Sequence, residues 1–202
     1  FSSYDLVISL SASFAKGIIT KPGTHHICYC LTPPRFLWDN SQKFAEEFGY
    51  PWIVRRLLPP FLTYLRMWDY EASHRVDHFI AISDFVCARI KKYYGKESLV
   101  VHPHVDTEAF SPGPGTRNYF LMVGRLVAYK KFDLAVSAFK QLGLPLKIVG
   151  TGPQQKHLKS LGGSTIEWIG PVSDDQLVSY YRNARAVIFP REEDFGIVPL
   201  EA

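Results

Sequence analysis

The sequence predicts an α/β protein made of two parallel-sheet domains joined by a linker. Short apolar runs bounded by turn residues alternate with segments of helical periodicity, which is typical of βαβ units with parallel strands. Residues 102–117, rich in proline and glycine, interrupt the alternation and indicate a domain boundary. We expect a first domain over residues 1–102, a linker over 103–117 and a second domain over 118–202. The chain opens on Phe1 and ends where a helix is expected to begin, so we expect both domains to be incomplete.

In the first domain, short apolar runs predict buried strands at Asp5–Leu10, His26–Cys30, His78–Ser83 and Leu99–Pro103. Ser83 or Asp84 suits the N-cap of a helix over Asp84–Tyr94. Another helix is predicted by apolar residues at helical spacing, which are Leu57, Phe61, Leu65 and Trp68. Pro59 and Pro60 lie within that pattern, and because proline removes a helical hydrogen bond we expect them to interrupt the helix.

In the second domain the alternation is more regular. The predicted strands are Tyr119–Val123, Leu146–Val149, Ile166–Ile169 and Ala186–Phe189. The predicted helices are Lys131–Leu142, Pro153–Leu161 and Asp174–Ala184. Ser173 and Gln176 form a capping box at the start of the third helix. Parallel strands place their carboxyl ends at one edge of the sheet, and ligands bind at that edge in folds of this kind.

Composition and charge exclude several classes of protein. The net charge of +4 is modest and the motifs of nucleic-acid readers are absent, so nucleic acid is not an expected partner. A mild positive balance suits a ligand that carries phosphates, or an anionic membrane surface. No run of about 18 apolar residues occurs, so no membrane-spanning helix is expected.

The chain has three cysteines, Cys28, Cys30 and Cys87. We expect buried thiols in a reducing compartment rather than metal ligands. We expect Cys28 and Cys30 not to share a site, on the argument that residues of a strand alternate between its two faces.

Charged residues and glycines follow the predicted strands of the second domain. Gly124, Arg125 and Lys130 follow the first strand, and the turn Gly150–Gly152 follows the second. An acidic loop follows the fourth strand and leads to Glu201. Taken singly, each has a simpler reading as a solvated charge, a tight turn or a solvated loop. Together at one edge they can bind a diphosphate through cations and backbone amides, and a sugar through carboxylates that accept hydroxyl hydrogen bonds.

The motifs of the second domain resemble the donor-binding domain of glycosyltransferase family 4, whose enzymes have the GT-B architecture of two Rossmann-like domains facing a cleft. The main signature is Glu-x7-Glu, from Glu193 to Glu201, preceded in family order by GRLVAYKKFDLAVSAF, GTGP and IEWIGPVSDDQL. One such motif is weak, but four in order are specific. The first domain resembles bacterial members that build surface polysaccharides, through HICYCLTPPRFLWD, RVDHFIAISDFVCARIKKYYG and VVHPHVDTEAF.

This resemblance implies roles for individual residues. Arg125 and Lys130 would bind the donor diphosphate and neutralise the departing nucleoside diphosphate, with Lys130 preferred to Lys131 because it falls where the family lysine falls. Glu193 would hold the donor sugar, and Glu201 the ribose. Arg125, Lys130 and Glu193 would thus be the catalytic residues. Backbone contacts to sugar, phosphate and base would come from glycine turns and loop residues, namely Gly124, Gly150, Gly152, Ile169, Gly170, Phe195, Gly196 and Ile197.

The acceptor side of the resemblance contains a departure from the family pattern. Related sequences usually have a histidine in the Y-C-x-T-P segment, where this chain has Leu31, and that histidine is thought to contact the donor sugar. Thr32 and Arg35 follow and would lie on the acceptor side. A basic and aromatic region could face a lipid-linked acceptor and the membrane interface, or its helical part could be core; it comprises Arg35, Trp38, Arg55, Arg56, Arg66 and Trp68.

The resemblance therefore implies a retaining glycosyltransferase that moves a hexose to a glycan or lipid-linked glycan. Mannose from GDP-mannose is the first expectation, because YKKFDLAVSAF is most similar to mannosyltransferases, and UDP-glucose or a UDP-hexosamine is the nearest alternative. Family members need no metal or other cofactor, since cationic side chains serve the leaving group. The expected location is cytoplasmic, with peripheral contact to the inner face of the membrane. The alternatives are a non-catalytic GT-B protein that binds nucleotide sugar, which Leu31 favours, and a GT-B sugar-nucleotide epimerase.

Overall fold

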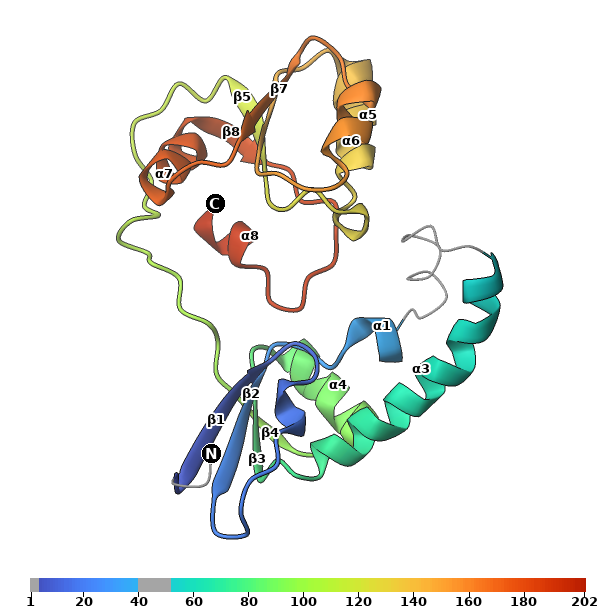
Figure 1. Ribbon diagram of the computed structural model, residues 1–202. Helices are drawn as coiled ribbons and strands as arrows, with labels where there is room; N and C mark the ends of the chain where they lie inside the picture. Colours follow the sequence, from blue (N-terminus) through green and yellow to red (C-terminus); the bar gives the residue numbers. More distant parts are fainter. Residues whose placement is uncertain (1–3, 40–51) are drawn as a thin grey trace. The chain divides into compact units, whose positions relative to one another are not determined.

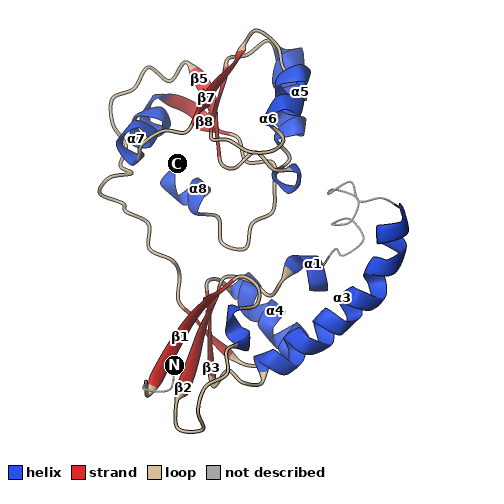
Figure 2. Ribbon diagram, in the orientation of Figure 1, coloured by secondary structure: helices blue, strands red, loops and turns tan. Residues whose placement is uncertain are grey.

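The computed structural model describes residues 4–39 and 52–202 and divides into two compact units, Phe1–Pro103 and His104–Ala202 (Figure 1). In the described part of each unit, four parallel strands form one sheet (Figure 2). The predicted α/β class with two parallel sheets is confirmed. The division between the units falls at the start of the expected linker, whereas the acceptor and donor roles of the two domains stay predictions.

The first unit contains the strands β1 (Leu6–Ser11), β2 (His25–Cys30), β3 (His78–Ala81) and β4 (Ser98–Val100), which pair in chain order. Its helices are η1 (Ala15–Gly17), α1 (Arg35–Trp38), α3 (Trp52–Ser73) and α4 (Asp84–Tyr94). The predicted cap of α4 is confirmed, because the Ser83 hydroxyl accepts a hydrogen bond from the Val86 amide at 3.2 Å. Gly95, with a φ of 67°, ends that helix in the left-handed conformation.

Cys28 and Cys30 share one face of β2, and the prediction that they do not share a site is wrong. Both thiols are buried together with His26, because residues two positions apart on a strand point to the same side. A hydrogen bond between the two thiols lowers the pKa of Cys28 and raises that of Cys30. Cys87 is half-buried rather than buried. Within residues 4–39 and 52–202, no three His, Cys, Asp or Glu side chains are grouped to hold a metal ion.

A buried ion pair between Lys16 and Asp69 joins η1 to α3. The Trp38 indole and the Tyr94 hydroxyl donate hydrogen bonds to the same carboxylate, at 2.9 and 2.7 Å. A buried charge is tolerated only when it is paired and hydrogen-bonded. This network therefore ties α1, α3 and α4 together beside the sheet. Burial and the neighbouring Asp69 charge raise the pKa of Tyr94.

Helix α3 runs without a break through Pro59 and Pro60, so the predicted interruption is wrong (Figure 1). Each proline removes one amide donor, but the helix keeps its buried contacts on the later turns, where Leu62, Asp69 and Ala72 are buried. Tertiary packing thus outweighs the local cost of the prolines.

None of the described helices is apolar enough over a sufficient length to cross a membrane.

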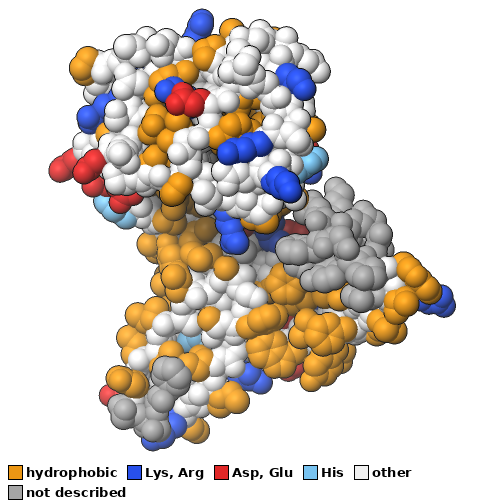
Figure 3. All heavy atoms as spheres, turned by 45° about the horizontal axis from the view of Figure 1, so that its top comes forward, with side chains coloured by type: hydrophobic (Ala, Val, Ile, Leu, Met, Phe, Trp, Pro, Cys, Tyr) orange, Lys and Arg blue, Asp and Glu red, His pale blue; other side chains and the backbone are white. Residues whose placement is uncertain are grey.

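The stripe of apolar residues on α3 is only partly core. Trp68 is half-buried and its ring lies 5.5 Å from that of Phe14, in an edge-to-face arrangement. Leu57 and Phe61, in contrast, are 66% and 57% exposed. The side chain of Arg55 lies outside the described residues. Other large apolar residues of this helix are also exposed, and Figure 3 shows hydrophobic side chains on the surface of this unit; they include Trp52, Ile53, Tyr64 and Met67.

The second unit contains the strands β5 (Tyr119–Val123), β6 (Leu146–Val149), β7 (Ile166–Gly170) and β8 (Ala184–Val187), in the order β7-β6-β5-β8. Its helices are η2 (Ala128–Lys130), α5 (Phe132–Leu142), α6 (Gln155–Leu161), α7 (Asp174–Asn183) and α8 (Ile197–Glu201). The core lies between the sheet and helices α5 and α6, and includes Met122, Leu126, Phe132, Val136, Leu146 and Ile148. The capping box of Ser173 and Gln176 on α7 is confirmed.

Strand β8 begins two residues earlier than predicted, directly after α7. Ala184 pairs with Tyr119 and Val187 with Leu121. The apolar residues Ile188 and Phe189, which extended the predicted strand, lie beyond the paired segment. The Ile188 amide still donates to the Leu121 carbonyl at 2.8 Å, and after it the chain forms the loop at the carboxyl edge that contains the predicted acidic residues.

Candidate functional site

Glycine turns follow three neighbouring strands at the carboxyl edge of the second sheet. Gly124 follows β5, Gly150 follows β6 and Gly170 closes β7, with φ values of 145°, 124° and 85°. The turns are hydrogen-bonded to one another, since the Gly124 amide donates to the Val149 carbonyl at 3.0 Å and the Gly150 amide to the Gly170 carbonyl at 2.8 Å. Positive φ values of this kind favour glycine. The predicted glycines therefore lie on one edge.

Gly150 and Gly152 allow the turn after β6 to pack directly on the turn after β5. A Cβ at Gly150 would overlap the Gly124 carbonyl oxygen, and a Cβ at Gly152 would overlap the Leu126 carbonyl. The Leu126 amide also donates to the Thr151 carbonyl at 2.9 Å. These glycines are therefore more than ordinary turn residues, because they bring two strand-end loops into backbone contact.

Lys130, Arg191 and Glu193 form a charged cluster above this edge. The Lys130 ammonium lies 3.9 Å from Glu193 Oε1, and Arg191 Nε lies 2.5 Å from the same oxygen. The side chains of Lys130 and Glu193 are 16% and 26% exposed, and that of Arg191 is 4% exposed. Lys130 comes from η2 after β5, whereas Arg191 and Glu193 come from the loop after β8. The fold thus brings together groups that are more than 60 positions apart in the chain.

The pKa of Lys130 is lowered from its ordinary value. Burial is the main cause, and the charges of Arg191 and Arg125 add to it, while the Glu193 carboxylate acts in the opposite direction. Several cations are therefore gathered around one carboxylate. Such an arrangement favours an anionic ligand, because the ligand would relieve the repulsion between like charges.

Not every predicted residue lies within this cluster. The Arg125 side chain is exposed, although it is near enough to influence Lys130. Lys131 is exposed at the start of α5 and has a φ of 54°. The preference for Lys130 over Lys131 agrees with these positions, but the roles of all these residues stay predictions. Sequence reasoning missed Arg191, which could have been noticed because it stands two residues before Glu193 in the same loop.

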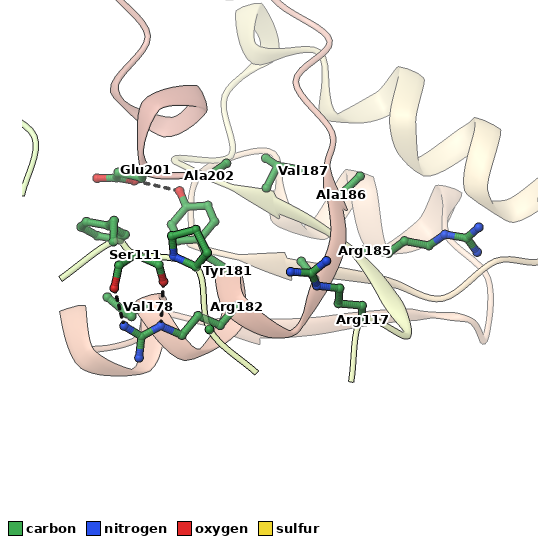
Figure 4. A pocket seen from close by; sticks show the side chains of 14 residues that line it. Ser111, Arg117, Val178, Tyr181, Arg182, Arg185, Ala186, Val187, Glu201 and Ala202 are labelled. Carbon is green, nitrogen blue, oxygen red and sulfur yellow. Dashed lines mark hydrogen bonds between the residues drawn. The ribbon is translucent and has the colours of Figure 1, made fainter. Parts of the chain in front are cut away.

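Glu201 lies at the end of α8 and contacts a different neighbour. Its carboxylate accepts a hydrogen bond from the Tyr181 hydroxyl at 2.8 Å (Figure 4). Burial and this carboxylate raise the pKa of Tyr181. Both residues line a cavity of about 240 Å³ beside the edge strand β8, together with Ser111 and Arg182. Lys130, Arg191 and Glu193 do not line this cavity.

The predicted backbone contacts lie in the loop that ends at α8. Gly196 has a φ of 86° and is the N-cap of α8, and Phe195 and Ile197 flank it. Ile169 and Gly170 form the end of β7 on the same sheet edge. A Cβ at Gly196 would meet nothing closer than 3.6 Å, so glycine is required there by backbone conformation rather than by space.

Gly196→Ala is therefore expected to lower the free energy of unfolding by about 1–2 kcal/mol, the cost of the left-handed conformation for a residue with a Cβ. Equilibrium urea unfolding measures the change. Gly163→Ala is the matched control in the same unit, because its Cβ would meet only the flexible Lys140 side chain. Equal stability of the two variants would contradict the conformational explanation.

The predicted acceptor-side residues take part in contacts within the first unit. The Thr32 hydroxyl accepts a hydrogen bond from Arg89 Nη1 at 2.9 Å, and Arg89 also pairs with Asp39. Arg35 Nε lies 3.7 Å from a carboxylate oxygen of Asp39, the C-cap residue that follows α1. Leu31 is half-buried. These residues have structural partners in this unit, and their role toward an acceptor stays a prediction.

Comparison with known proteins identifies the second unit. The family profile of glycosyl transferases group 1 matches residues 105–202. The second unit belongs to the group 1 glycosyl transferases. The glycine turns and the charged cluster of Lys130, Arg191 and Glu193 thus lie inside a group 1 domain. Assignment to family 4 within that group stays a prediction.

Relatives and solved structures extend the likeness beyond the group 1 domain. The chain is 29% identical over 148 residues to a D-rhamnosyltransferase of Pseudomonas aeruginosa, a match that covers 63% of this chain and 39% of the relative. It is 33% identical over 91 residues to O-antigen chain mannosyltransferase C of Escherichia coli, covering 42% of this chain and 24% of the relative. A sucrose-phosphate synthase structure from Thermosynechococcus elongatus matches with a TM-score of 0.70 and 16% identity, over 98% of this chain and 53% of that one. This structural likeness shows the predicted GT-B fold. The chain spans less than half of the length of both relatives.

Proposed function

We propose that this protein is a retaining glycosyltransferase that transfers a hexose from a sugar nucleotide to a glycan. The observation that carries the proposal is the cluster of Lys130, Arg191 and Glu193 above the glycine turns of a group 1 domain. Cations at one sheet edge suit a diphosphate, and a carboxylate beside them suits the hydroxyls of the attached sugar.

In this proposal the cations serve the leaving group. When the bond between the sugar and the diphosphate breaks, negative charge grows on the departing phosphate. Lys130 and Arg125 would stabilise that charge, the work that a divalent ion does in other transferases. Glu193 would orient the sugar through a hydroxyl group, and Glu201 would hold the ribose. Activity is then independent of added metal.

The proposed donor is GDP-mannose. D-rhamnose is 6-deoxymannose, so the names of a D-rhamnosyltransferase and an O-antigen chain mannosyltransferase both refer to manno-configured hexoses. This likeness, at 29% and 33% identity, supports mannose over glucose for the present protein. UDP-glucose and a UDP-hexosamine are the competing donors.

The proposed acceptor is a lipid-linked glycan at a membrane surface. Support comes from α3, where Ile53, Leu57 and Phe61 are exposed at helical spacing on one face, and Arg56 is also exposed. Aromatic and aliphatic side chains beside arginine suit the boundary between lipid head groups and acyl chains. A short exposed apolar stripe of this kind would lie on the membrane rather than cross it.

A second candidate is a group 1 protein that binds a sugar nucleotide without turnover. Leu31 favours it, because related sequences usually have a histidine at that position and leucine cannot donate or accept a hydrogen bond. The two candidates share the donor site and differ in whether product forms.

A donor panel tests the proposal. GDP-mannose, UDP-glucose and UDP-N-acetylglucosamine are added to the purified protein, and the true donor is expected to raise the free energy of unfolding by about 2.7 kcal/mol at one hundred times its Kd. Product is then sought with a lipid-linked acceptor in anionic vesicles, in excess EDTA, and its anomeric configuration is determined by NMR. Stabilisation without product supports the non-catalytic candidate. An inverted product contradicts retention, and the absence of stabilisation by any sugar nucleotide contradicts the donor site itself.

A further inference from the structure

The guanidinium of Arg191 is deeply buried in the charged cluster and lies over the ring of Phe189. Its side chain is 4% exposed, and its central carbon lies 4.4 Å from the centroid of the Phe189 ring. Stacking on an aromatic face favours one orientation of the planar group. A cation that is buried at this level is costly unless its donors are satisfied. The groups that face Nε and the terminal nitrogens of Arg191 therefore indicate what this side chain binds.

The two edges of this guanidinium face different neighbours. Nε faces Glu193, at 2.5 Å from Oε1. The terminal nitrogens face the backbone of Gly124, because a Cβ placed on that glycine would lie 3.4 Å from Nη1 and 3.7 Å from Nη2. Arg191 therefore lies between the carboxylate proposed to hold the sugar and the first glycine turn of the sheet edge.

Lys130 and Arg191 approach the same point above Gly124. The Lys130 ammonium lies 3.4 Å from that Cβ position, the same distance as Arg191 Nη1. A single anion above Gly124 would therefore contact both cations. The two positive charges repel each other, which is one cause of the lowered pKa of Lys130.

Glu193 does not satisfy Arg191 fully. The contact with Glu193 Oε1 is ionic, and among residues 4–39 and 52–202 Arg191 Nε finds no acceptor in hydrogen-bond geometry. Lys130 and Arg191 both approach the same oxygen of Glu193, Oε1. The cluster thus retains unsatisfied positive charge on one side and a carboxylate oxygen on the other.

We propose that Arg191 is a further donor-binding residue, whose terminal nitrogens bind the phosphate that is bonded to the sugar. This inference rests on the proposed function. Because Arg191 contacts Glu193, which is proposed to hold the sugar, the phosphate within its reach is the one next to the sugar. Its Nε edge faces Oε1 of Glu193, and Oε2 would accept a hydrogen bond from a sugar hydroxyl. Arg191 thereby sets the distance between the sugar and diphosphate subsites.

Calorimetric titration of the full chain with GDP, UDP, GMP and UMP tests this role. In Arg191→Ala the affinity for the better-bound diphosphate is expected to fall by about tenfold to a hundredfold, the range for a lost charge-assisted contact. The affinity for the corresponding monophosphate is expected to change by less than about twofold, because the phosphate next to the sugar is absent from it. Arg191→Lys keeps the positive charge but has no planar guanidinium that can contact Glu193 and a phosphate at once. An intermediate loss of diphosphate affinity is therefore expected.

Lys159→Ala is the control, because Lys159 is an exposed cation of α6 in the same unit and does not line the cavity that contains Glu201. Melting curves of all variants show whether they fold. Unchanged diphosphate affinity in both Arg191 variants overturns the inference and leaves the proposed function intact. An equal loss of monophosphate and diphosphate affinity in both variants also overturns it, since it indicates a structural role. Failure of the unmodified protein to bind either diphosphate overturns the inference together with the proposed donor site.

Discussion

Lys130→Ala is expected to lower kcat/KM by about 100-fold or more, the scale for removing a cation that faces charge developed in the transition state. The Lys130 ammonium is mostly buried and lies 3.9 Å from Glu193 Oε1. Lys131→Ala is the matched control, because Lys131 is the adjacent residue and is exposed. Steady-state kinetics with the donor identified by the panel measures the effect. Equal losses in the two variants would remove Lys130 from the proposed site.

The pH profile gives an independent readout of Lys130. Only the protonated amine can neutralise a phosphate, and the pKa of Lys130 lies below the ordinary lysine value of 10.5. As the pH rises through this lowered pKa, kcat/KM is expected to fall on an alkaline limb that lies below pH 10.5. Lys130→Arg should abolish that limb, because arginine stays protonated. An unchanged limb in this variant would show that another group titrates.

Glu193→Gln is expected to lower kcat by about tenfold to a hundredfold, whereas Glu201→Gln is expected to raise the donor KM by about tenfold with kcat nearly unchanged. The sugar gains positive character at its reacting carbon, so a group that orients the sugar acts mainly in the transition state. The ribose is unaltered by the reaction, so a contact with it is nearly equally strong in the ground state and the transition state. Loss of such a contact raises KM and leaves kcat nearly unchanged. The two carboxylates also have different neighbours, since Glu193 contacts Arg191 and Glu201 accepts from Tyr181.

Tyr181→Phe separates ribose binding from a purely structural role of Glu201. This variant removes the 2.8 Å hydrogen bond to Glu201 but keeps the carboxylate. If Glu201 binds ribose, Tyr181→Phe should change the donor KM much less than Glu201→Gln does. Similar melting temperatures and similar KM values in these two variants would indicate that Glu201 acts only by anchoring α8. Equal kcat losses in Glu193→Gln and Glu201→Gln, with unchanged KM, would contradict separate sugar and ribose roles.

Local sequence signals predicted most elements of the fold. Tyr119–Val123, Leu146–Val149 and Asp84–Tyr94 have the predicted bounds, because apolar runs and a serine cap are determined by neighbouring residues. The predicted interruption of the helix at Pro59 and Pro60 was wrong because it considered only neighbouring residues. Proline weakens a helix locally, but the buried contacts of α3 are made with residues distant in the chain, and no local rule includes them.

The sequence by itself determined the α/β class, the glycine turns at the strand ends and the presence of Arg125, Lys130, Glu193 and Glu201 in one motif order. Only the tertiary structure decided which charged groups meet. Parallel pairing of β5 with β8 brings the loop of Arg191 and Glu193 to Lys130, while Glu201 turns to Tyr181. Sequence order could not distinguish these neighbours, because contacts between charges depend on distances across the sheet, which strand pairing and loop packing set together.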